Sequence, residues 1–228
     1  MTSEAELERK FFDAFPDRFL GSLIRLLAHN YKTTHDRCKE YPHSEAHDLR
    51  PHLRRAEIER DVRDLTTRYP DIQADAEANR RGTSFYTLVS SNRIVLTLSA
   101  VAHPNILVRR ACFRETYAQS SQLEMFTTRR EPPPGAKIYA LLLHGPDRKD
   151  PSRPAFMHIA FPDARLRKYL HSIDLFARYF ALVYTLWPAQ SAEEPIASPE
   201  LQPRKDARER ADEARRKLAD DEKKGETG

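Results

Sequence analysis

Four residues with metal-binding side chains lie close together in the chain, separated by two, four and three residues. Imidazole nitrogen and thiolate sulfur are the ligands that tetrahedral zinc prefers, and a short polar loop can fold around such an ion. The spacing therefore predicts a zinc site, with His52 close enough to replace one ligand. An ordinary solvated loop that is rich in histidine is the alternative. The candidate ligands are His35, Cys38, His43 and His47.

Segment 35–47 resembles a zinc knuckle, a small metal-binding family whose members bind single-stranded nucleic acid. The resemblance covers thirteen residues. The segment departs from the family's pattern in having three histidines and one cysteine in place of a thiol-rich set, and Pro42 where the family usually carries a glycine. The resemblance implies zinc as a cofactor and a nucleic acid as a partner.

Arginine is concentrated in the middle of the chain. Residues 80–130 contain eight arginines, no lysine and two acids, so this segment carries a net charge of +6, whereas the whole chain carries +4. The planar guanidinium group binds phosphate through two parallel hydrogen bonds and stacks on bases. We therefore expect a nucleic-acid-binding surface, with an acidic protein surface as the alternative partner. The candidate contacts are Arg80, Arg81, Arg109, Arg110, Arg114, Arg129 and Arg130.

In the predicted helix at 163–187, the apolar residues from Leu175 to Trp187 spread around nearly the whole circumference. One face can pack on a sheet, so the other face must be covered by another element or by a partner. The second candidate function is therefore a protein-binding adaptor or chaperone-like module, with homodimerisation through this helix as one form of it. Burial of the helix inside the monomer is the alternative. The candidate interface residues are Phe176, Tyr179, Phe180, Tyr184 and Trp187.

Signatures of enzyme classes are sparse. The chain has six glycines, and its glycines form no phosphate-binding loop or nucleophile elbow. Asp147-Arg148-Lys149, together with Pro70-Asp71, resembles the pattern of metal-dependent nucleases, in which acids hold the metal and lysine polarises the nucleophile. We therefore expect a non-catalytic protein and keep a metal-dependent nuclease as the third alternative.

Hydrophobic periodicity predicts an α+β fold. Two N-terminal helices precede two hairpins, and each hairpin leads into a helix. Both hairpins end in similar capping segments at an offset of 58 residues, which suggests a ββα-ββα duplication; shared capping chemistry in unrelated hairpins is the alternative. We expect one sheet with helices packed on one face. The predicted helices are 4–31 (kinked at Pro16), 51–69, 106–126 and 163–187, and the predicted strands are 84–90, 93–102, 138–144 and 155–161.

The length of the chain favours a single compact domain over 1–190, with a helical part at 1–70 and a sheet-and-helix part at 83–187. A proline-rich linker and a charged tail, helical or disordered, are expected at 191–228. Two distant cysteines give no disulfide framework, the first residues do not have the pattern of a signal peptide, and the most apolar stretch is too short to span a bilayer. These features predict a cytoplasmic protein without a membrane span.

Overall fold

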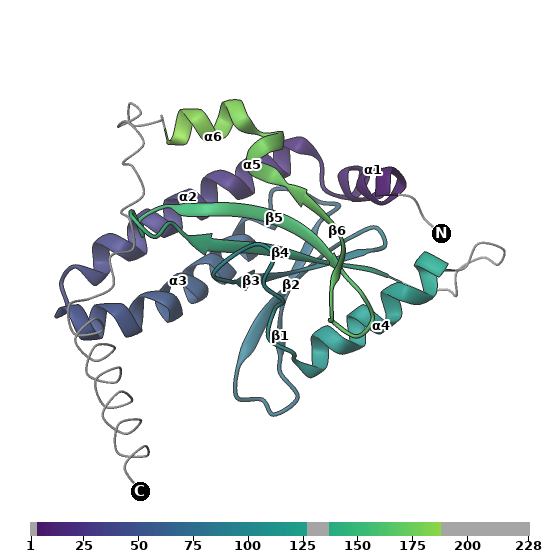
Figure 1. The fold of residues 1–228 in the computed structure, drawn as a ribbon, viewed down its shortest axis with the longest axis horizontal. Helices are drawn as coiled ribbons and strands as arrows, with labels where there is room; N and C mark the ends of the chain where they lie inside the picture. Colours follow the sequence, from purple (N-terminus) through teal and green to yellow (C-terminus); the bar gives the residue numbers. More distant parts are fainter. Residues whose placement is uncertain (1–3, 127–136, 188–228) are drawn as a thin grey trace, which may run out of the picture. The chain divides into compact units, whose positions relative to one another are not determined.

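The structure is a computed structural model that describes residues 4–126 and 137–187, which belong to one compact unit, Met1–Pro188 (Figure 1). Within these ranges, no helix is both long enough and apolar enough to cross a membrane. The predicted linker and tail lie outside the described residues. The elements are α1 (Glu4–Ala14), α2 (Asp17–Cys38), α3 (His43–Thr66), β1 (Gln73–Ala78), β2 (Phe85–Ser91), β3 (Ile94–Ala100), α4 (Cys112–Phe126), β4 (Ile138–Pro146), β5 (Pro154–Pro162), β6 (Tyr169–Asp174), α5 (Leu175–Arg178) and α6 (Phe180–Leu186).

The six strands lie in the sheet in the same order as in the chain, from β1 at one edge to β6 at the other. β1, β2 and β3 form an antiparallel meander, and so do β4, β5 and β6. β3 and β4 are parallel, with Ile94 opposite Ile138 and Ala100 opposite His144. A parallel pair needs a crossover connection, and this connection contains α4. The α+β class with a mixed sheet is therefore confirmed.

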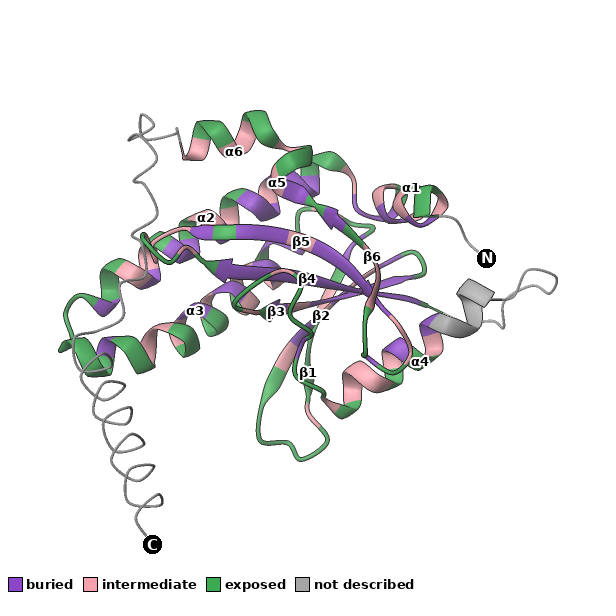
Figure 2. Ribbon diagram, in the orientation of Figure 1, coloured by how far each residue is buried: buried purple, intermediate pink, exposed green. Residues whose placement is uncertain are grey.

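The N-terminal helices cover one face of the sheet. In β3, Ile94 and Leu96 pack with the apolar side chains of α1, α2 and α3, whereas Val95 belongs to the core on the opposite face. Phe11 and Phe19 are fully buried in the layer between helices and sheet. Figure 2 shows the buried residues along the central strands and on the inner sides of these helices. The larger core therefore lies between the N-terminal helices and the sheet.

α4 covers the opposite face of the sheet. Its Ala118 is buried in a second core with Val95 and Leu141, and the Ser121 hydroxyl accepts a hydrogen bond from the backbone N–H of Tyr139 in β4 (3.1 Å). β4 is consequently buried on both faces. The prediction that the helices pack on one face is therefore wrong. The reason is that the crossover from β3 to β4 passes over the face that α2 and α3 leave open.

Two prolines affect the N-terminal helices differently. Pro16 separates α1 from α2, as the sequence predicts, because proline has no backbone N–H and clashes with the preceding turn. Pro51 does not begin a helix but lies inside α3, which begins at His43. Most of the residues between the two predicted helices, 32–50, are therefore helical, and only a short turn separates α2 from α3. This turn brings the C-terminal end of α2 beside the N-terminal part of α3.

The segment after β5 forms a turn and a strand rather than the predicted helix. The Asp163 carboxylate accepts hydrogen bonds from the backbone N–H groups of Arg167 and Lys168, and Leu166 has a left-handed φ of 51°. This turn starts β6, and the helical residues begin only after Asp174, whose carboxylate caps α5. With β1 also missed, the ββα-ββα prediction is corrected to two βββ meanders, each followed by helix.

Candidate functional site

The long loop 101–111 between β3 and α4 is attached to β6 through one side chain. The Tyr169 hydroxyl accepts a hydrogen bond from the backbone N–H of Val108 (3.1 Å) and donates one to the carbonyl of Ile106 (3.0 Å). The helix expected from residue 106 therefore begins only at Cys112. Arg109 directly follows Val108, which is fixed to β6, and its own side chain is exposed.

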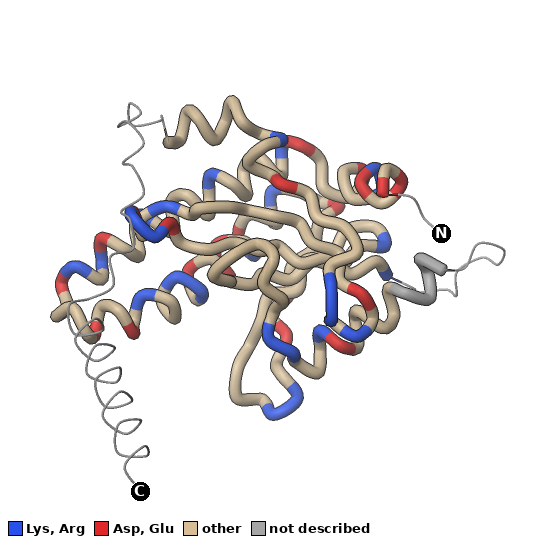
Figure 3. Tube along the Cα trace, viewed as in Figure 1, with Lys and Arg blue, Asp and Glu red and all other residues tan. Residues whose placement is uncertain are grey.

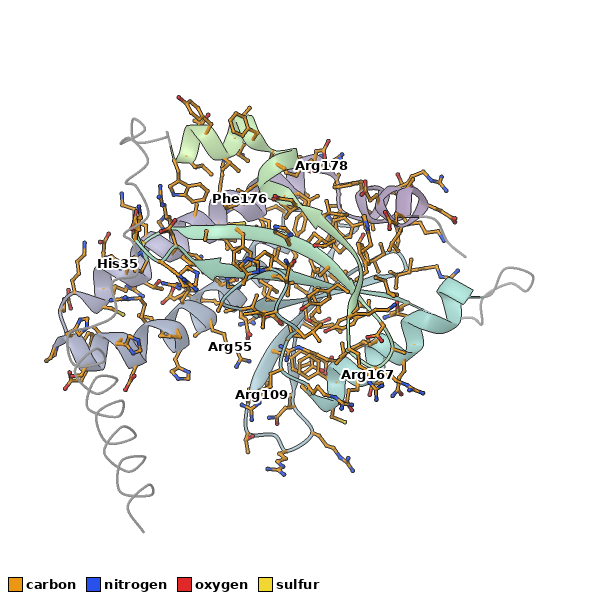
Figure 4. All side chains as sticks on the ribbon, viewed as in Figure 1. His35, Arg55, Arg109, Arg167, Phe176 and Arg178 are labelled. Atoms are coloured by element: carbon orange, nitrogen blue, oxygen red, sulfur yellow. The ribbon has the colours of Figure 1, made fainter. Side chains whose placement is uncertain are left out.

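The turn between β5 and β6 carries three exposed cations: Arg165, Arg167 and Lys168. Lys168 directly precedes the tyrosine that binds loop 101–111, so this turn and the arginines that follow Val108 lie beside each other. Figure 3 shows both basic segments in the lower half of the view, and Figure 4 shows Arg109 and Arg167 there. The sequence pattern did not indicate this part of the surface, because the turn lies inside the helix predicted at 163–187.

Arg80 and Arg81 lie in the turn between β1 and β2, where both are exposed. The Asn79 side chain organises this turn, since its carbonyl accepts hydrogen bonds from the backbone N–H groups of Arg81 (3.1 Å) and Thr83 (3.0 Å). Gly82 supplies the positive φ of 67° that the turn requires. The two arginines are therefore held on an ordered hairpin.

The exposed ring of Phe85 lies at the start of β2, next to this hairpin turn; 59% of its surface is exposed. The pairing between β2 and β3 stops at Leu88 and Thr97, so Phe85 is paired with Ala78 of β1 but has no partner in β3. Arg55 of α3 donates a hydrogen bond to the Phe85 carbonyl through Nη2 (2.6 Å). The backbone below the exposed ring is thus fixed by a side chain from another element.

Arg114, predicted as a phosphate contact, lies half-buried in α4. It donates hydrogen bonds to the Arg109 carbonyl (2.8 Å) and the Ser99 hydroxyl (2.9 Å). Its burial lowers the pKa of its guanidinium from the usual value. The adjacent Phe113 stacks on Tyr86 of β2 with ring centroids 3.7 Å apart. Arg114 therefore supports the loop that carries Arg109, and its neighbours pack α4 on the sheet.

The exposed cations are mostly without acidic partners. Arg110 pairs with Glu115 at 2.8 Å. In the described part of the chain, no carboxylate forms an ion pair with the other exposed cations of these turns and loops, which are Arg80, Arg81, Arg109, Arg165, Arg167 and Lys168. We name as the basic surface Arg80, Arg81, Arg109, Arg110, Arg165, Arg167 and Lys168. Arg129 and Arg130, also predicted as contacts, lie outside the described residues.

The predicted zinc ligands do not converge. His35 and Cys38 belong to the last turns of α2, and His43 and His47 to the first turns of α3. Cys38 is fully buried, whereas His43 and His47 are exposed. Over residues 4–126 and 137–187, no group of three or more His, Cys, Asp or Glu side chains is arranged to hold a metal ion. The same finding covers Asp71 and Asp147, so the structure adds no support to the nuclease pattern.

The predicted interface residues divide between two environments. Phe176, Tyr179 and Trp187 are partly buried against the larger core, and the Tyr179 hydroxyl donates a hydrogen bond to Asp17 of α2 (2.5 Å). Phe180 and Tyr184 are 67% and 52% exposed and lie next to each other on α6, with ring centroids 6.0 Å apart. The monomer therefore covers part of this helix and leaves two aromatic rings exposed.

No protein-family model, curated protein or solved structure shows significant similarity to the chain.

Proposed function

We propose that the basic surface binds the phosphate backbone of a nucleic acid, and that the protein is a non-catalytic, nucleic-acid-associated accessory protein. The observation that carries this proposal is the pair of hydrogen bonds from Tyr169, which hold the segment with Arg109 beside the turn with Arg167. Cations on separate loops can follow successive phosphates, and arginine suits phosphate because its donors are fixed in a plane. Few acids neutralise these side chains, so their charge is available to a polyanion.

The exposed ring of Phe85 favours a single-stranded nucleic acid within this proposal. Unpaired bases stack on exposed aromatic rings, whereas a duplex presents mainly phosphates and groove edges. The Phe85 backbone is fixed by Arg55, and the turn with Arg80 and Arg81 lies next to it. A base on the ring would thus lie near cations that hold its phosphates.

Fluorescence anisotropy with labelled single- and double-stranded DNA and RNA of mixed sequence tests the proposal. At low ionic strength we expect saturable binding, tighter for the single strands. Because electrostatic binding is strongest at low salt, an absence of binding to all four probes under those conditions would refute the proposed function.

The second candidate function is a protein-binding module, and the exposed pair on α6 is the observation that favours it. Phe180 and Tyr184 form an exposed aromatic pair on α6, whose other large apolar side chains, Leu182, Val183 and Leu186, are partly buried against the core. A second copy of the chain is the partner to test first, by sedimentation equilibrium of the protein and of the double variant Phe180→Ser, Tyr184→Ser. A dimer that only the unaltered protein forms would support this candidate, and a monomer at all concentrations would contradict it.

A further inference from the structure

A buried arginine lies where α2, α3 and the β4–β5 hairpin meet. Only 6% of the surface of Arg54 is exposed, and its guanidinium carbon lies 4.0 Å from the centre of the Tyr31 ring. Its Nη2 donates a hydrogen bond to the carbonyl of Pro151 in the hairpin (3.0 Å). Burial is the main cause that lowers the pKa of Arg54, and the nearby charge of Arg50 lowers it further.

No carboxylate in the described part of the chain forms an ion pair with Arg54 or Arg50, so this positive charge has no acidic partner there. Buried charges are normally paired, because the interior solvates them poorly. The two carboxylates of the hairpin are bonded within their own loop: Asp147 accepts from two backbone N–H groups, and Asp150 accepts from the N–H and hydroxyl of Ser152. The charge of Asp150 acts on His35, not on Arg54.

The groups beneath Arg54 do not supply a negative charge either. The Tyr31 hydroxyl and His144 Nδ1 share a hydrogen bond of 2.8 Å. Burial raises the pKa of Tyr31, and burial together with the charge of Arg54 lowers the pKa of His144 to about 3. Both groups are therefore neutral at physiological pH and do not balance the charge of Arg54.

Three buried polar atoms in this region have no hydrogen-bond partner: Nε of Arg54, Nε of Arg50 and Nδ1 of His35. The described residues contain only two further side-chain atoms of this kind, in Ser91 and Arg114. The three atoms come from α2 and α3 on either side of the short turn that joins these helices. Buried donors are almost always bonded, and each exception needs an explanation such as an ion that satisfies it.

We propose that this cluster binds a phosphate-type oxyanion, with the guanidinium groups of Arg54 and Arg50 and the Nδ1–H of His35 as its ligands. A tetrahedral oxyanion can accept hydrogen bonds from several directions and would balance the buried charge. The hairpin whose Pro151 carbonyl binds Arg54 also carries Arg148 and Lys149, which are exposed and would attract an anion to this end of the molecule. The site is separate from the basic surface and does not depend on the proposed function.

Inorganic phosphate is the probe, compared with chloride and acetate at equal ionic strength and at pH 6.5. Thermal unfolding and titration calorimetry should show saturable, phosphate-specific stabilisation that is close to one site per chain. Arg54→Met should abolish it, whereas Arg55→Met, a change at the adjacent exposed arginine, should retain it. Arg50→Gln and His35→Gln, at less buried positions, should each weaken phosphate binding roughly tenfold.

Phosphate could also bind to the basic surface, so the variant Arg109→Gln, Arg167→Gln is the second control and should keep the stabilisation. Three outcomes would overturn the proposal. They are equal effects of phosphate and chloride, an equal effect of acetate, and unchanged phosphate binding in Arg50→Gln and His35→Gln. If Arg54→Met does not fold, those two variants still decide the question.

Discussion

At the scale of single residues, the arginines of this chain have different roles that their sequence positions do not distinguish. Arg109 is exposed, whereas Arg114, five residues later, is half-buried and bonded to the Arg109 carbonyl. Arg55 is exposed and bonds the Phe85 carbonyl, whereas Arg54 is buried and stacks on Tyr31. Sequence composition predicted where arginine is abundant but not which side chains reach solvent, because exposure depends on packing against distant elements.

Phe85→Ala should weaken binding to a single-stranded oligonucleotide by about 1–3 kcal/mol, the usual contribution of one base stacked on an aromatic ring. The ring is largely exposed, so the free energy of unfolding should change by less than about 0.5 kcal/mol. Anisotropy and urea denaturation measure the two quantities. Phe180→Ala removes another exposed ring and is the matched control. An equal loss in both variants would contradict a stacking role for Phe85.

Because His144 is buried in its neutral form, we expect the protein to lose stability in acid. The folded-state pKa of His144, about 3, lies below the usual value of 6.5, so between these values the unfolded chain binds a proton that the folded chain excludes. Stability should therefore be complete above pH 6.5 and fall as the pH drops toward 3, by up to about 1.4 kcal/mol per pH unit. Urea denaturation at several pH values should show a shallower decline in His144→Gln. The same slope in both proteins would contradict this account.

At the scale of elements, local sequence patterns predicted helices and strands correctly where tertiary packing favours the same structure. The helix break at Pro16 and the central strands β3 and β4 follow the predicted pattern. The segment after Asp163 did not, because a capping aspartate serves a tight turn as well as a helix start, and only the pairing of β6 with β5 distinguishes the two. β1 was missed because its residues are almost all exposed and lack an apolar alternation.

The junction of β4 with the loop after β3 depends on one glycine. A Cβ atom on Gly145 would meet the Val101 carbonyl and lie 2.8 Å from the Phe156 ring, whereas one on Gly21 in α2 would have its nearest neighbour at 3.7 Å. Gly145→Ala should thus cost about 1–3 kcal/mol of unfolding free energy, and Gly21→Ala should cost nothing or add slightly to stability. Chemical denaturation compares them. Equal stability of the two variants would contradict the close packing at Gly145.

At the scale of the whole molecule, the sheet separates two layers with different features. The N-terminal helices and the larger core lie on one face, and the cluster around Arg54 lies where these helices meet the β4–β5 hairpin. α4 and the smaller core lie on the other face, where loop 101–111 contacts β6 and places its arginines beside the β5–β6 turn. The sequence predicted an excess of arginine, but only the fold shows which loops share one surface.

The most direct test of the proposed function is the salt dependence of nucleic-acid binding in a matched pair of double variants. Arg109→Gln, Arg167→Gln removes two charges from the basic surface, and Arg25→Gln, Arg68→Gln removes two exposed charges elsewhere. Each phosphate contact contributes roughly 0.7–0.9 to the slope of log K against log salt concentration. The first variant should therefore reduce this slope by about one to two units, and the second should leave it unchanged. Equal slopes for the unaltered protein and both variants would contradict binding through the basic surface.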